Sequence, residues 1–153
     1  PILVIMKSIP VVALAVYMFL IVGSKRGPYF IAYLVALPIM LEGFILGIDS
    51  IPQPIQMELA LTEVPKWKKF IQIFLPMMKK NLVTAFLQTL GITFKSMIMG
   101  EYVCQTKNSI GVLIYDSKSF LEMDMLLAVS ILIVIIVFIG EVIAKRIEKK
   151  LFA

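Results

Sequence analysis

Residues 52–76 read PQPIQMELALTEVPKWKKFIQIFLP and form the longest stretch of the chain that is not membrane-like. Proline is well tolerated at the first turn of a helix, so Pro52 and Pro54 indicate a helix start, and we expect a first short helix over residues 55–63. Pro65 disfavours the helical conformation at the residue before it and should end that helix.

A second short helix is predicted to begin at Pro65. Its bulky apolar side chains recur at spacings of three, four and seven residues, which puts them on one helical face: Trp67, Phe70, Ile71 and Phe74. Three lysines fall on the side facing water or a partner: Lys66, Lys68 and Lys69. One interpretation is a pair of interfacial helices lying on the lipid surface. The other is a helical hairpin between two membrane spans, through which a soluble protein moves those spans.

Composition predicts an integral membrane protein, because 60% of the 153 residues are hydrophobic, against about 45–50% in ordinary soluble domains. The net charge is +5, but the basic residues cluster beside the spans. That arrangement indicates membrane orientation and no nucleic-acid partner. The chain has no histidine and one cysteine, Cys104, which excludes a disulfide framework, a Cys/His metal site and a His-based triad. We therefore expect no catalytic residue, no metal and no cofactor.

Four membrane spans are predicted in a single all-α transmembrane domain covering residues 1–153: about residues 10–23, 29–48, 81–99 and 125–143. A loop at residues 49–80 carries the two short helices. The first span falls short of the roughly 20 residues that a crossing needs. The sequence starts at Pro1 without Met, so we expect further spans before it.

The distribution of lysine and arginine predicts the orientation. The loop at residues 49–80 holds five lysines, and the tail after residue 143 holds four basic residues. Two spans separate these segments, so both lie on one side, which the positive-inside rule makes cytoplasmic. Lys25 and Arg26 fall on the outer side, against the rule, but the nine basic residues of the loop and the tail outnumber them.

Four stretches together resemble a known family: SIPVVAL (8–14), ALPIMLEGFILGIDSI (36–51), WKKFIQIFLP (67–76) and GEYVCQTKNSIGVLIYDS (100–117). They are similar to the permease subunit of bacterial type I ABC importers, the binding-protein-dependent class, and most of all to its nitrate/sulfonate/taurine group. In the last stretch Glu101 and Gly111 are the matching pair. The resemblance covers nearly the whole chain.

The loop signature of that family is degenerate in this chain. The family has Glu-Ala-Ala followed by a Gly four positions after the last Ala. A gapless alignment puts Met57, Glu58 and Leu59 at the triplet and Glu63 at the Gly place. A shift of one residue recovers Glu58 and Ala60 without the Gly. We therefore expect the loop to dock on a partner, with a geometry that differs in detail from the family's.

The resemblance implies a type I ABC importer transmembrane fold in the bacterial inner membrane. It also implies three partners: a dimer of a cytoplasmic ABC ATPase, an extracytoplasmic solute-binding protein and a second permease copy. ATP hydrolysis would belong to the ATPase subunit. The first loop helix would be the coupling element, with the docking residues Ile55, Met57, Glu58, Leu59, Ala60, Thr62 and Glu63. Trp67, Phe70, Ile71, Phe74 and Pro76 would anchor the loop to the spans.

Three charges lie at or near membrane depth: Glu42, Lys95 and Glu101. Each costs roughly 2.5–3.5 kcal/mol on insertion scales, so each should face the bundle interior or an aqueous cavity. One interpretation places them on the path of a small anionic solute, which a lysine would suit. The alternative is a structural ion pair between Lys95 and Glu42 that locks two spans together.

Two other classes of function remain open at this point. The chain could be a membrane-embedded assembly subunit that docks a partner without transport. A membrane enzyme is disfavoured, because no predicted span carries paired carboxylates, a histidine or a dense polar cluster.

Overall fold

The computed structural model describes residues 2–152, except for the side chains of Ile2, Ala60, Leu151 and Phe152. Over that range the chain is helical and has no strand, which confirms the all-α fold class. The elements are α1 (Ile2–Ser8), α2 (Val11–Val22), α3 (Gly27–Asp49), α4 (Gln53–Leu61), α5 (Lys66–Lys69), the π-helix η1 (Phe70–Phe74), α6 (Leu75–Cys104), α7 (Ile110–Ser119) and α8 (Met123–Phe152).

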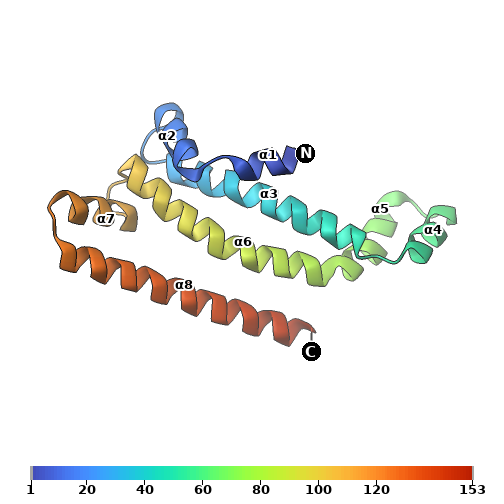
Figure 1. The fold of residues 1–153 in the computed structure, drawn as a ribbon. Coiled ribbons are helices and arrows are strands. Elements are labelled where there is room, and N and C mark those ends of the chain that lie inside the picture. The colour runs from blue at the N-terminus through green and yellow to red at the C-terminus, as the bar shows by residue number, and fades with distance from the viewer. Residues whose placement is uncertain (1, 153) are drawn as a thin grey trace.

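Three of these helical segments are long and apolar enough to cross a membrane: Gly27–Asp49, Lys66–Cys104 and Met123–Lys150. They lie alongside one another in Figure 1, with α4 and α5 at one end of the molecule and α2 and α7 toward the other. The C-terminal end of α8 points toward the same end as α4 and α5. The predicted first span at residues 10–23 corresponds to α2, a helix of 12 residues. The four-span topology stays a prediction.

Helices α3 and α6 pack antiparallel along their length through small residues. A Cβ added at Gly43 would lie 2.1 Å from the Cβ of Ala85, and one at Gly47 would lie 3.0 Å from the side chain of Met78. Gly43 and Gly47 are four residues apart, the G-x-x-x-G spacing that lets membrane helices approach closely. At the other end, a Cβ on Gly100 would lie 2.8 Å from Ile31. The two helices therefore form one tightly packed pair.

A small core fixes the end of this pair that is remote from α4. Ala15 of α2, Ile31 of α3 and Cys104 of α6 are buried together there. Helix α2 is separated from α1 by Ile9 and Pro10, and Pro10 caps α2 in an extended conformation. Proline at this place has no N–H to contribute and presets the first turn. The start of α2 at Val11 therefore follows from the sequence.

The predicted second loop helix and third span are one continuous helical segment, Lys66–Cys104, of 39 residues. Nothing in the lysines and asparagine at residues 79–81 breaks a helix, so the segment runs on. Its one irregularity is the π-turn Phe70–Phe74, which is followed by Pro76. A proline ring clashes with the carbonyl four residues before it in a regular α-helix. A widened turn at this point relieves that clash.

Candidate functional site: a polar groove and a helical extension

Polar side chains recur along one face of α6 and along one face of α8. On α6 they are Thr84, Gln88 and Lys95, at spacings of four and seven, and on α8 they are Glu141, Lys145 and Glu148, at spacings of four and three. These spacings put each set on one side of its helix. All six line one cavity of about 360 Å³ between the two helices.

Two direct contacts join these faces. The Thr84 hydroxyl donates a hydrogen bond to the Glu148 carboxylate, with 2.5 Å between the oxygens. The Lys95 ammonium lies 3.9 Å from the nearest carboxylate oxygen of Glu141. Glu141 and Glu148 were not among the residues predicted for a site. Their seven-residue spacing, repeated by polar residues on α6, is the sequence signal that points to them.

A second cavity of about 550 Å³ opens beside the first, between α3, α6 and α8. Thr84, Gln88 and Glu148 line both cavities. From α3 it adds Glu42, and from the N-terminal turns of α6 it adds Lys80 and Asn81. We call the two cavities together the polar groove. It contains Glu42 and Lys95, two of the three charges expected at membrane depth.

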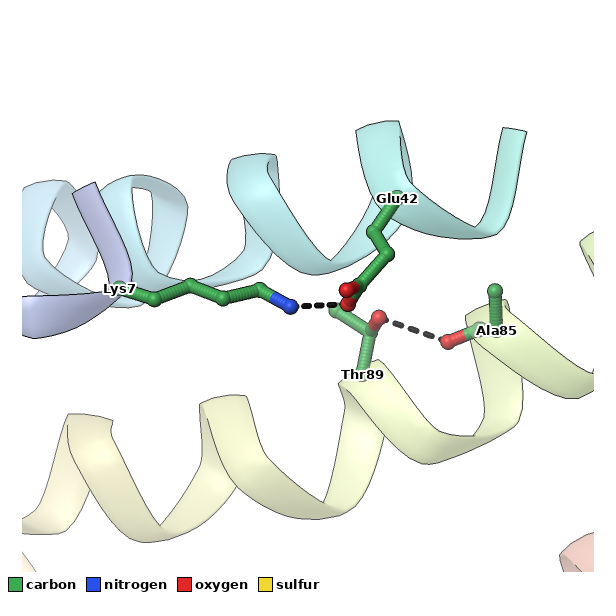
Figure 2. A network of polar contacts seen from close by, with 4 residues as sticks. All are labelled: Lys7, Glu42, Ala85 and Thr89. Carbon is green, nitrogen blue, oxygen red and sulfur yellow. Dashed lines mark hydrogen bonds and ion pairs between the residues drawn. The ribbon is translucent and has the colours of Figure 1, made fainter. Parts of the chain in front are cut away.

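Glu42 does not pair with Lys95. Its carboxylate accepts a hydrogen bond from the ammonium group of Lys7, which comes from α1. Figure 2 shows the Lys7 side chain extending to the Glu42 carboxylate, which points from α3 toward α6. The alternative of a Lys95–Glu42 lock is therefore wrong. The reason is topological, because α1 lies against α3 and offers a nearer cation.

Glu101 is not among the residues that line the polar groove. Its carboxylate accepts a hydrogen bond from the backbone N–H of Gly111, with 3.1 Å between nitrogen and oxygen, at the first turn of α7. The Ser109 hydroxyl caps the same turn by accepting from the N–H of Val112. Acceptors at a helix start satisfy N–H groups that have no partner within the helix. The observed contact of Glu101 holds α7 against α6.

Helix α4 forms an extension beyond the paired spans. It covers Gln53–Leu61, so it begins and ends two residues earlier than predicted. Its end is set by Thr62, which is extended and whose hydroxyl donates to the carbonyl of Glu58 at 2.9 Å. Pro65 therefore does not set it. Met57 is 65% exposed and Leu61 is 87% exposed. Large apolar side chains this exposed on a short helix indicate a surface that a partner or lipid covers.

Some of the predicted docking residues are exposed to solvent and others are partly buried. Met57, Glu58, Thr62 and Glu63 are exposed, whereas Ile55 and Leu59 are partly buried. The side chain of Ala60 lies outside the described part of the chain.

The predicted anchor residues do not act as one face. The ring of Phe70 packs against that of Phe44 on α3, with centroids 6.0 Å apart. Trp67, by contrast, is 64% exposed, and Ile71 and Pro76 are exposed as well, while Phe74 is partly buried. The π-turn explains the difference, because it changes the number of residues per turn within the set. A face assigned with the α-helical period does not continue through it.

Lys69 also differs from its predicted place on the outer side of the loop. Its ammonium donates to the backbone carbonyls of Leu59 and Thr62, at nitrogen–oxygen distances of 2.5 and 2.6 Å. It is partly buried, whereas Lys66 and Lys68 are exposed. Lys69 thus joins α5 to the end of α4.

Comparison with known proteins gives one match. The family model described as "Binding-protein-dependent transport system inner membrane component" matches residues 1–153, the whole sequence. No curated protein and no solved structure matches significantly.

Proposed function

This chain belongs to the family of binding-protein-dependent transport system inner membrane components, and from that premise we propose how it couples to its motor and what it carries. Membership makes it the permease subunit of an ABC importer, with the type I transmembrane fold and a place in the inner membrane. Permeases of this family are transport components that work with an ATPase and a solute-binding protein. The family resemblance found in the sequence is thereby confirmed at this level.

We propose that α4 is the coupling helix and docks on a cytoplasmic ABC ATPase dimer. The observation that carries the proposal is that α4 stands beyond the paired spans with Met57 and Leu61 exposed. After the turn at residues 62–65, the helical segment Lys66–Cys104 runs on into α6 without a break. Closure of the ATPase on ATP would displace α4, and the helix that follows would carry the displacement into the membrane. The loop and the C-terminus then lie in the cytoplasm, as the positive-inside rule favours.

We propose that the polar groove is part of the solute path, with Glu42 and Lys95 on it. Charged side chains at membrane depth are costly, and those retained there face cavities. Among the described residues the ammonium of Lys95 has one ionic contact, at 3.9 Å with Glu141, so it keeps free donors for an anionic group. The solute we propose is a small anion of the sulfonate, nitrate or taurine type, or a vitamin precursor. Glu101 would serve the path from its outer end by holding α7 in place.

We further propose that the working unit contains two copies of the permease. Helix α8 is mostly exposed along its length, and the polar groove between α3, α6 and α8 is not enclosed by them. A second copy around a central axis would close the path.

The test of coupling is a double substitution on α4, Glu58→Lys with Leu59→Asp. It reverses a charge and places a carboxylate on the partly apolar face without touching the spans. We expect the variant to insert in the membrane normally and to lose co-purification with the ATPase subunit. The matched control is Lys107→Glu, in the turn between α6 and α7, which should leave co-purification intact. A normal complex with the double variant would refute the coupling role of α4.

A further inference from the structure

Helix α4 is held to the rest of the protein by few contacts. Among the described residues it packs extensively along no other helix. Its N-terminal side is tied by the Gln56 side-chain amide, which donates to the carbonyl of Ile51 at 2.8 Å. At its C-terminal side the chain turns through residues 62–65 before helix α5 begins. A force applied to α4 therefore reaches the spans through its ends.

The C-terminal end of α4 is joined to α5 by hydrogen bonds from the side chain of Lys69. The Lys69 ammonium donates to the carbonyl of Leu59, in the last turn of α4, and to the carbonyl of Thr62, just beyond it, at 2.5 and 2.6 Å. The last carbonyls of a helix have no partner within the helix, and they carry the negative end of its dipole. A lysine at this place satisfies both demands at once. Hydrogen bonds from a charged donor are also about twice as strong as neutral ones.

Lys69 sits at the point where the extension joins the membrane segment. The next residue, Phe70, begins the π-turn and packs on Phe44 of α3. From there the helix runs without interruption to Cys104, and Gly43 and Gly47 hold it tightly to α3. A contact that fixes α4 to Lys69 therefore fixes it to the pair α3–α6.

We propose that Lys69 is a positioning residue that makes α4 and α5 move as one body, so that displacement of α4 by the ATPase is passed to α6. This inference rests on the proposed coupling role of α4 and adds the element that transmits the motion. Without the Lys69 contacts, the turn at residues 62–65 can bend. The ATPase would then still bind and displace α4, but bending of the turn would keep this displacement from reaching α6.

The chain offers a matched control for this residue. Lys68 is the adjacent residue, has the same side chain and is exposed. Methionine has nearly the length and volume of lysine without the ammonium. Lys69→Met therefore removes the two hydrogen bonds while keeping the stem, and Lys68→Met removes an equal charge without them. Lys69→Arg keeps a cationic donor and serves as the conservative variant.

The experiment uses the assembled permease–ATPase complex in proteoliposomes, in a Cys104→Ala background. An environment-sensitive fluorophore is attached at Met57→Cys, which reports docking on α4, or at Lys107→Cys, which reports movement at the far end of α6. The probe is ATP with vanadate, so no transported solute is required. In the parent protein we expect both fluorophores to respond.

With Lys69→Met we expect the Met57 response to persist and the Lys107 response to fall about tenfold, whereas Lys68→Met changes neither. Lys69→Arg should restore the Lys107 response. Full responses at both sites in Lys69→Met would overturn the inference while leaving the coupling role of α4 standing. Loss of both responses would also overturn it, because Lys69 would then be needed for docking itself. A parent protein with no response at Met57 would remove the coupling role and the inference together.

Discussion

The Glu101 carboxylate accepts a hydrogen bond from the backbone N–H of Gly111, and these two residues are the pair by which residues 100–117 resemble the permease family. The contact joins the last turn of α6 to the first turn of α7. Tyr102 strengthens the joint, since its hydroxyl accepts from the Lys118 ammonium at 3.0 Å. This bond raises the pKa of Lys118 above its ordinary value.

Gly111 leaves no room for a side chain at this joint. A Cβ there would lie 2.3 Å from the backbone nitrogen of Tyr102 and 2.6 Å from the carbonyl oxygen of Ile98. Backbone atoms cannot move aside cheaply, so we expect Gly111→Ala to lower the free energy of unfolding by about 1–3 kcal/mol. Titration with denaturing detergent in mixed micelles measures this. Gly140→Ala is the control, because no heavy atom lies within 4 Å of a Cβ placed there. An equally stable Gly111→Ala variant would contradict the close packing of α7 on α6.

Gly43→Ala should separate α3 from α6, because the new Cβ would lie 2.1 Å from that of Ala85. We expect this variant to lose about 1–3 kcal/mol of stability. Ala85→Gly removes the opposing Cβ, so the double variant Gly43→Ala with Ala85→Gly should recover part of the loss. A double-mutant cycle on unfolding free energies checks this. Strictly additive effects of the two changes would show that these positions do not touch.

The Lys7–Glu42 contact predicts that the free energy of unfolding depends on both side chains. Both side chains are partly exposed, at 36% and 49%, so we expect Glu42→Gln or Lys7→Met alone to cost at most about 1 kcal/mol. Removing both charges should cost less than the sum of the two single changes, because neither charge is then left unpaired. Unfolding free energies of the two single variants and the double variant test this. A double variant that loses the full sum would argue against a direct contact.

We expect Pro76 to set the orientation of the preceding residues relative to α6, through the π-turn that it favours. Replacing it with alanine removes the ring that a regular α-helix would reject, so we expect Pro76→Ala to convert the π-turn into α-helix. Loss of one residue from the turn would rotate the preceding residues by about 100°. Phe70 would then leave Phe44. Cross-linking of Phe44→Cys to Phe70→Cys by a short bifunctional thiol reagent, in a Cys104→Ala background, should be efficient with Pro76 and weak without it, because the two rings pack 6.0 Å apart between centroids. Equal cross-linking would contradict the assignment of the π-turn to Pro76.

Much of the helical architecture was predictable from the sequence. Continuous apolar runs predict helices at residues 29–48 and 125–143, and α3 and α8 cover both. Proline positions placed the starts of α2 and α5, which follow Pro10 and Pro65. In each case a strong local signal acts, either a missing N–H or an uninterrupted apolar run.

The arrangement of the site was less predictable, because it depends on contacts between distant residues. Lys7 reaches Glu42 across 35 positions, and nothing near Glu42 in the sequence distinguishes it from Lys95 as a partner. The hydrogen bonds of Lys69 to the end of α4 depend on where that helix ends, which is two residues from the predicted position. The π-turn breaks the α-helical period on which the aromatic face was assigned. The polar groove, in contrast, has a visible signal in the repeated spacing of polar residues on α6 and α8.

We propose that α4 lies in the cytoplasm and is covered by the ATPase. The most direct measurement is the labelling rate of Met57→Cys, in a Cys104→Ala background, by a membrane-impermeant thiol reagent in inside-out and right-side-out vesicles. We predict fast labelling in inside-out vesicles stripped of the ATPase, strong protection when the ATPase is added back, and no labelling in right-side-out vesicles. Lys107→Cys should show the opposite sidedness and no protection. Labelling of Met57→Cys only in right-side-out vesicles, or an inside-out rate that the ATPase does not change, would contradict the account.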